Sequence, residues 1–174
     1  MSSLTELSDD QQDVLTSLNV VFSGASCIGS GFIIVCFIAF KDLRKFSFQL
    51  VFWLSVSDLI NGLGNLFGNP EPGVLCSLQA YTTQFFSIAS ILWTTVIAYV
   101  LHRTVVQHCT DVANLGRKFH LYVWITSLVA TILPMFTNSY GPAGAWCWVV
   151  ARNTGDKVLR FITFFLPLWL AIPY

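Results

Sequence analysis

Long runs of residues without a charged side chain are the feature that most restricts how this chain can fold. Residues 20–40 form a stretch of 21 residues that contains no Asp, Glu, Lys or Arg. At a rise of about 1.5 Å per residue, a helix of this length covers about 30 Å, the thickness of the hydrocarbon core of a bilayer. The stretch therefore predicts a helix that spans a membrane.

Four further stretches have the length and apolar character of membrane helices, and they cover residues 46–66, 75–101, 119–136 and 158–174. Only 10% of the residues in the chain are charged, against about 25% in soluble domains. We therefore expect an all-α membrane protein, and the lipid bilayer is the partner that its surface contacts. The alternative is a very apolar soluble helical bundle. The net charge of zero gives no support to nucleic-acid binding.

The basic residues between the predicted spans orient the chain in the membrane. Lys and Arg gather in cytoplasmic loops, and six of them lie in the connectors after the first and third spans: Lys41, Arg44, Lys45, Arg103, Arg117 and Lys118. The opposite loops contain only Arg152 and Lys157. We expect residues 1–19, which are acidic and polar, to be an extracellular segment, followed by a transmembrane domain over residues 20–174.

One carboxylate lies in the middle of the second span, where residues 54–60 read LSVSDLI. A charge that faces lipid at this depth costs at least about 2.5–3.5 kcal/mol, so we expect Asp58 to face the protein interior. Asn61 and Asn65 continue one helical stripe from Asp58. The stripe predicts a sodium, proton or switch site at Asp58, and the alternative is a structural hydrogen-bond hub. Thr83, Ser87, Ser90 and Thr94 form a similar stripe in the third span, for which simple packing is the expected role.

Two of the five cysteines are expected on the oxidising side of the membrane. Cys76 opens the third span and Cys147 lies in the outside loop over residues 138–148. Because disulfides persist in oxidising compartments, this topology predicts a bridge between them. Two free thiols are the alternative. Cys27 and Cys36 lie inside the first span and are expected to be small packing residues.

The chain contains no motif of an enzyme, a cofactor site or a metal site. No phosphate-binding loop or nucleophile motif occurs. His102, His108 and His120 do not have the spacing of metal ligands, and we expect them to be solvated at the cytoplasmic surface. The sequence gives no indication of a catalytic residue.

Several of these features occur together in seven-helix G-protein-coupled receptors. The stretches LRKFSFQLVFWLSVSDLI, ILWTTVIAYVLHRTVV, FHLYVWITSLV and AWCW resemble the cyclic-AMP-receptor-like group of these receptors, and most closely its plant member. The similarity covers most of residues 20–170. It implies a seven-transmembrane receptor bundle that is truncated in the fifth helix, because this chain has five predicted spans.

The resemblance also implies roles for single residues. Asp58, with Asn61 beside it, matches the second-helix aspartate that holds water or sodium and couples to activation. Arg103, in the sequence HRT, stands where a third-helix arginine meets the G protein, although the rhodopsin-like pattern Asp/Glu-Arg-Tyr is absent. Trp124 matches the tryptophan that packs against the second and third helices. Cys76 and Cys147 match the outside disulfide.

The function implied is that of a receptor in the plasma membrane that transmits a signal to a heterotrimeric G protein. The ligand cannot be read from the residues, and a receptor oligomer is compatible with them. The alternative function is that of a non-signalling, truncated isoform that associates with or regulates the full-length receptor. A small transporter is a third hypothesis, which a single intramembrane aspartate without an internal repeat does not favour.

Overall fold

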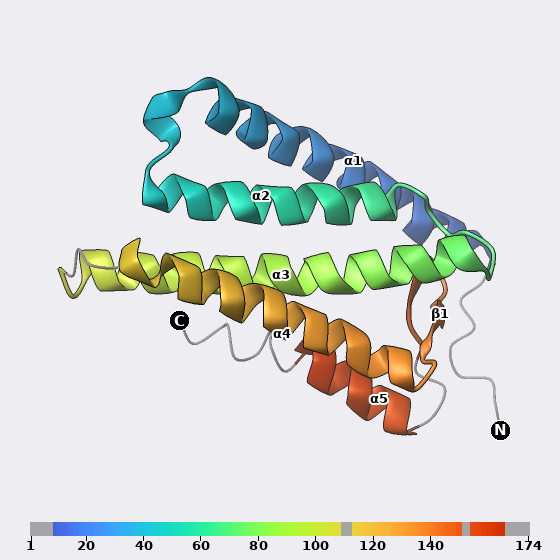
Figure 1. The fold of residues 1–174 in the computed structure, drawn as a ribbon. Helices are drawn as coiled ribbons and strands as arrows, with labels where there is room; N and C mark the ends of the chain where they lie inside the picture. Colours follow the sequence, from blue (N-terminus) through green and yellow to red (C-terminus); the bar gives the residue numbers. More distant parts are fainter. Residues whose placement is uncertain (1–8, 109–112, 151–153, 166–174) are drawn as a thin grey trace.

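The computed structural model describes residues 9–108, 113–150 and 154–165. Four long helices make up most of the fold: α1 (Asp9–Ala39), α2 (Phe46–Asn65), α3 (Val74–Val105) and α4 (Gly116–Phe136). All four are long and apolar enough to cross a membrane. They lie side by side, with α3 between α2 on one side and α4 on the other (Figure 1).

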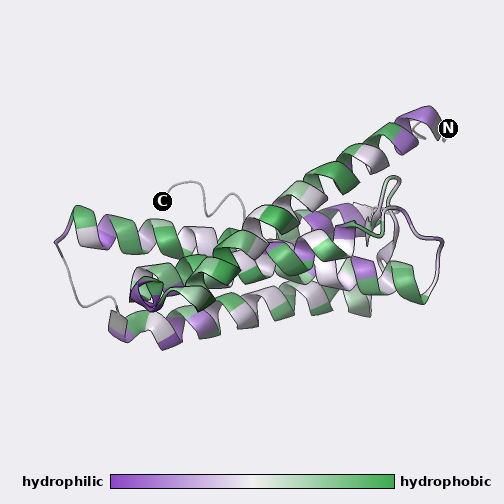
Figure 2. Ribbon diagram, turned by 90° about the horizontal axis from the view of Figure 1, so that it is seen from above, coloured by the Kyte–Doolittle hydropathy of each residue, from purple (hydrophilic) through white to green (hydrophobic). Residues whose placement is uncertain are grey.

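The first helix begins earlier than the sequence predicted. We expected a span over residues 20–40, whereas α1 extends from Asp9 to Ala39. Residues 9–19 of the expected extracellular segment therefore continue the helix, and residues 1–8 lie outside the described part. The 31 residues of α1 measure about 46 Å along the axis, which exceeds the hydrocarbon core of about 30 Å. Figure 2 shows α1 reaching beyond the other helices at its N-terminal end, where the ribbon is hydrophilic.

The third and fourth helices also extend past their predicted ends, which were residues 75–101 and 119–136. The charged and polar residues that flank each apolar run, such as Arg103 and Lys118, are helical as well, because long basic side chains can place their charges in water from the end of a membrane helix. The fifth predicted span, residues 158–174, lies partly outside the described residues. Its described portion, residues 158–165, comprises the end of α5 (Thr154–Arg160), which begins before the predicted span, and a π-helical turn, η3 (Phe161–Phe165).

The connectors are short. A single turn of 3-10 helix, η1 (Lys41–Leu43), joins α1 to α2, and η2 (Ala113–Leu115) precedes α4. After α2, the chain reverses at Gly68, which adopts a left-handed φ of 65° that glycine accepts without a steric penalty.

A small β-hairpin is the departure from the all-α expectation. Strands β1 (Tyr140–Pro142) and β2 (Cys147–Val149) pair antiparallel, with Gly141 opposite Trp148. Nearly all of the hairpin falls in the stretch over residues 138–148 that the sequence predicted to be a loop, and β2 extends one residue beyond it. All three residues of β2 are buried, and both strands contact α3. Three-residue strands are too short for a visible alternation of polar and apolar residues, so the pattern did not predict them.

The core lies along α3, where Ile88, Ala89 and Trp93 are fully buried against residues of α2 and α4. The outward faces are apolar instead of charged, with Phe22 and Phe32 each 69% exposed and Phe136 81% exposed. Large exposed aromatic and aliphatic side chains on long helices are typical of surfaces that contact lipid. The chain is therefore a multi-pass membrane protein.

Candidate functional site

The polar site that joins α2 to α3 is built around the carboxylate of Asp58. The hydroxyl of Ser90 donates a hydrogen bond of 2.6 Å to Oδ1 of Asp58. Asp58 is half-buried at this interface, so it turns toward the neighbouring helix, as a carboxylate at this depth is expected to do. Ser90 also has Thr94 bound to its backbone carbonyl, at 3.0 Å.

Two asparagines extend this contact along the interface. Ser87 donates to Oδ1 of Asn61 at 3.1 Å, so a second hydroxyl of α3 reaches a second polar side chain of α2. Asn65, which is buried, donates to the backbone carbonyl of Asn61 at 3.0 Å and to its side-chain oxygen at 3.4 Å. Two stripes that the sequence suggested separately are thus paired across the two helices. We refer to Asp58, Asn61, Asn65, Ser87 and Ser90 as the polar seam.

The chemistry of the seam follows from its donors and acceptors. An ionised carboxylate accepts about four hydrogen bonds, and the seam supplies Asp58 with one donor from α3. The second oxygen of Asp58 has lone pairs for a cation, a water molecule or a proton. In the described part of the chain, no group of three His, Cys, Asp or Glu residues could hold a metal ion. The seam offers carboxylate, amide and hydroxyl oxygens, and oxygen ligands suit hard cations.

A cluster of aromatic rings lies beside the seam and joins α2, α3 and α4. Trp124 of α4 contacts Trp53 of α2 and Trp93 of α3, each with ring centroids 6.0 Å apart and in an edge-to-face arrangement. Phe85 stacks on Trp124 with centroids 5.9 Å apart. Such aromatic pairs contribute about 0.5–1.5 kcal/mol beyond their buried area.

One histidine differs from its predicted environment. We expected His120 to be solvated, but its ring lies edge-on to Trp53 at 5.2 Å and to Trp93 at 4.9 Å, and its Nδ1 accepts a hydrogen bond of 3.3 Å from Trp124. The expectation was wrong because His120 is one helical turn from Trp124 and on the same face of α4. His120 is therefore part of the packing.

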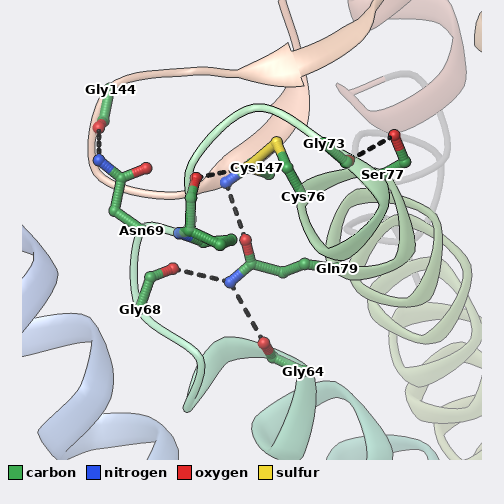
Figure 3. The surroundings of a disulfide bond; sticks show 10 residues. Gly64, Gly68, Asn69, Gly73, Cys76, Ser77, Gln79, Gly144 and Cys147 are labelled. Atoms are coloured by element: carbon green, nitrogen blue, oxygen red, sulfur yellow. Dashed lines mark hydrogen bonds between the residues drawn. A yellow bond between two sulfur atoms is a disulfide. The ribbon is translucent and has the colours of Figure 1, made fainter.

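The N-terminal end of α3 is linked to the hairpin by the disulfide between Cys76 and Cys147 (Figure 3), the pairing that the sequence predicted. Both cysteines are buried, with 2% and 0% of their surface exposed. Their Cα atoms are 5.3 Å apart and 71 residues separate them in sequence. The bridge holds the hairpin against the N-terminal end of α3.

Gln79 is a residue of this end that the sequence did not single out. Its amide nitrogen donates to the backbone carbonyls of Gly64 and Gly68, at 3.2 and 2.8 Å, and its oxygen accepts from the backbone N–H of Cys147 at 3.0 Å. One buried amide thus links α2, α3 and the hairpin (Figure 3). A glutamine within an apolar run was the available sequence signal, since buried polar side chains are hydrogen-bonded.

A second group beneath the hairpin was also missed. Trp148 donates from Nε1 to Oε1 of the fully buried Gln84, while the guanidinium of Arg160 lies 4.1 Å from the centroid of the Trp148 ring. Nε2 of Gln84, Oγ1 of Thr83 and Nε of Arg160 are buried without a hydrogen-bond partner among the described residues.

Burial and the neighbouring phenol of Tyr81 raise the pKa of Tyr140 above its ordinary value. The phenol therefore stays protonated and donates a hydrogen bond to the backbone carbonyl of Thr131.

The predicted residues do not form a single site. Arg103 lies in the last turn of α3, at the end remote from the hairpin, and its Nη1 donates to Gln107 at 2.6 Å. Asp58 lies within the bundle, and the disulfide closes the opposite end. The structure therefore arranges them in three layers: the hairpin, the polar seam with the aromatic cluster, and the basic end of α3.

Known receptors are similar to this chain over most of its length. The model of a family described as slime mold cyclic AMP receptor matches residues 6–173. "G-protein coupled receptor 1" from Arabidopsis thaliana is 48% identical over 168 residues, which are 97% of this chain and 51% of that protein. "Cyclic AMP receptor-like protein A" from Dictyostelium discoideum is 28% identical over 163 residues, which are 94% of this chain and 43% of that protein.

The fold is similar to that of squid rhodopsin. The TM-score with its crystal structure is 0.69 at 16% sequence identity, over 98% of this chain and 52% of that one. At this identity the likeness concerns the fold alone. The chain spans about half the length of the relatives that it matches.

Proposed function

The chain belongs to the family of slime mold cyclic AMP receptors, and from this membership we propose that it acts in transmembrane signalling by a receptor that couples to a heterotrimeric G protein. Because the chain spans about half the length of its relatives, the proposal concerns the longer receptor to which such a region contributes. The family match carries the proposal, and the three layers of the structure support it.

We place the N-terminus and the hairpin outside the cell and the basic end of α3 in the cytoplasm, with the plasma membrane as the location. The distribution of Lys and Arg supports this orientation. An oxidising exterior also agrees with the disulfide between Cys76 and Cys147. In this orientation a ligand would arrive at the hairpin side and the G protein at Arg103.

The polar seam is the proposed switch between these two ends. A change in the ion or proton at Asp58 alters the charge that faces Ser90, and the hydrogen bond between them connects α2 to α3. Since α3 also carries Cys76 at its outside end and Arg103 at its inside end, a shift of α3 at the seam reaches both layers. In this proposal the seam has two states, and both the ligand and the G protein shift the equilibrium between them.

The test is guanine-nucleotide exchange on a heterotrimeric G protein reconstituted in membranes with the longest protein that contains this chain. We expect exchange to rise above that of membranes without the receptor, and Arg103→Ala to remove most of the rise. Arg117→Ala is the matched control, because it deletes an exposed cation on the same side. Equal exchange with and without the receptor would contradict the proposal.

A second candidate function is association with a longer relative, without signalling by this chain alone. The observation behind it is that the chain spans only about half the length of its relatives. Residues 1–174 expressed beside the longer protein distinguish the two. Co-purification with it, and no exchange activity alone, is the expected result for this candidate.

A further inference from the structure

A groove between α3 and α4 is not used by the proposed signalling function. Its volume is about 260 Å³, and it is lined by Thr95, Val96, Tyr99, Phe119 and Tyr122. Two of these residues, Tyr99 and Phe119, pack with their rings edge-to-face and the centroids 6.0 Å apart. Tyr122 is 50% exposed, so the groove opens on the outer surface of the helix pair. In a bilayer this surface faces lipid.

The groove lies at the basic end of the two helices. Thr95, Tyr99 and Arg103 are each four residues apart on α3, and Lys118 and Tyr122 are four residues apart on α4. Residues at this spacing share one face of a helix. Side chains of a helix also lean toward its N-terminus, so Lys118 reaches beyond Tyr122 toward the end of the bundle. The spacing therefore puts Arg103 one turn beyond Tyr99 and Lys118 one turn beyond Tyr122, on the basic side of the groove.

The charged side chains of α3 and α4 themselves have one sign. Helices α3 and α4 contain no Asp or Glu at all, whereas they carry Arg103, Arg117 and Lys118. Arg103 already donates to Gln107, and Lys118 is exposed. An apolar groove with the ammonium of Lys118 on its basic side complements a molecule that has a hydrocarbon chain and an anionic headgroup. Basic pockets between membrane helices bind anionic lipid headgroups in this way.

From this complementarity we propose that the groove between α3 and α4 binds one anionic phospholipid of the leaflet on the basic side. One acyl chain lies in the groove against Tyr99, Phe119 and Tyr122, and the phosphate lies against the ammonium of Lys118. The hydroxyls of Tyr99 and Tyr122 are polar groups on aromatic rings, which are enriched at the level of the headgroups. The occupant is a lipid and not a soluble phosphate, because the groove walls are apolar.

The proposal is tested by native mass spectrometry of the full chain, released from micelles that contain phosphatidylserine and phosphatidylcholine with identical acyl chains. We expect one phosphatidylserine to stay bound in preference to phosphatidylcholine. Lys118→Ala should reduce its retention about fivefold, which corresponds to about 1 kcal/mol for one cation near a headgroup. Glycerol phosphate, which has the anionic group but no chains, should not displace the lipid.

Arg117→Ala is the matched control, since it removes a neighbouring exposed cation that stands one turn before Leu121, which does not line the groove. It should leave retention unchanged. Equal loss in Lys118→Ala and Arg117→Ala, or no preference for phosphatidylserine, would overturn the proposal, because the attraction would then be diffuse.

The position of the acyl chain is tested separately. A phosphatidylserine with a photoactivatable group in its acyl chain should label residues 95–99 of α3 and 119–122 of α4. Labelling spread over the exposed apolar face of α1 instead would overturn the proposal. The melting temperatures of Lys118→Ala and Arg117→Ala, compared with that of the unchanged protein, check that both variants are folded.

Discussion

Ser90 of α3 donates a hydrogen bond of 2.6 Å to the carboxylate of Asp58 in α2. This contact joins the two central helices at the level where a charge is hardest to solvate. Its neighbour Thr94 donates to a carbonyl of its own helix, so two hydroxyls one turn apart have different partners.

The first prediction uses this difference. Ser90→Ala should lower the free energy of unfolding by about 0.6–1.7 kcal/mol, which are the average and the maximum measured for hydrogen bonds between membrane helices. Thr94→Val, which deletes a hydroxyl that bonds only within α3, should change it by less. Thermal unfolding in one detergent measures both. Equal destabilisation would show that the contact with Asp58 contributes no extra stability.

The second prediction concerns the charge of Asp58. Asp58→Asn retains an oxygen that can accept from Ser90, so folding should be preserved. It removes the charge that a cation or proton would balance, so the dependence of G-protein activation on sodium should disappear in the longer receptor. If both sodium dependence and signalling match those of the unchanged protein, Asp58 is a structural hub.

The third prediction concerns the disulfide. The Cys76–Cys147 bridge closes a loop with a sequence separation of 71, for which the chain-entropy relation gives about 4 kcal/mol. The double replacement Cys76→Ser with Cys147→Ser should therefore lower the melting temperature markedly. Cys36→Ser is the control, because Cys36 is a free thiol. Peptide mapping under non-reducing conditions should recover the linked pair, and recovery of both as free thiols would refute the bridge.

The fourth prediction compares two buried glycines of α2. A Cβ at Gly62 would lie 2.6 Å from Sγ of Cys27 and 3.2 Å from the carbonyl oxygen of Ser23, whereas a Cβ at Gly64 would meet Thr82 and Thr83 at 3.6 Å. Gly62→Ala should therefore force α1 away from α2 at a cost of about 1–3 kcal/mol, and Gly64→Ala should be tolerated.

Adding Cys27→Ala should restore part of the stability lost in Gly62→Ala, because it removes the nearest atom. Without such a rescue, the close approach of α1 and α2 at Gly62 would not explain the loss. Thermal unfolding of the two single variants and the double variant measures the coupling.

The sequence predicted the features that depend on period and hydropathy. Helix α2, expected over residues 46–66, extends from Phe46 to Asn65. The agreement is close because the apolar run stays in the lipid while the charged connectors on either side of it stay in water. The fold class also followed, since the family features are spread along the chain in a fixed order. The inward orientation of Asp58 followed from the cost of exposing a carboxylate to lipid.

The rest depends on contacts between distant residues. Gln79 binds Gly64, Gly68 and Cys147, and no local pattern contains that information. The environment of His120 likewise depends on Trp53 and Trp93 from two other helices. The early start of α1 at Asp9 was missed because a polar stretch can be helical outside the bilayer, where hydropathy does not report it.

We propose that the hairpin and the N-terminal end of this membrane protein lie outside the cell and that its basic helix ends lie inside. The most direct measurement is labelling of single cysteines in intact cells with a reagent that does not cross membranes, in a background without Cys27, Cys36 and Cys109. Asp13→Cys should react in intact cells, and Arg117→Cys should react only after permeabilisation, since both positions are exposed. The reverse pattern, with Asp13→Cys reactive only from the cytoplasm, would contradict the account.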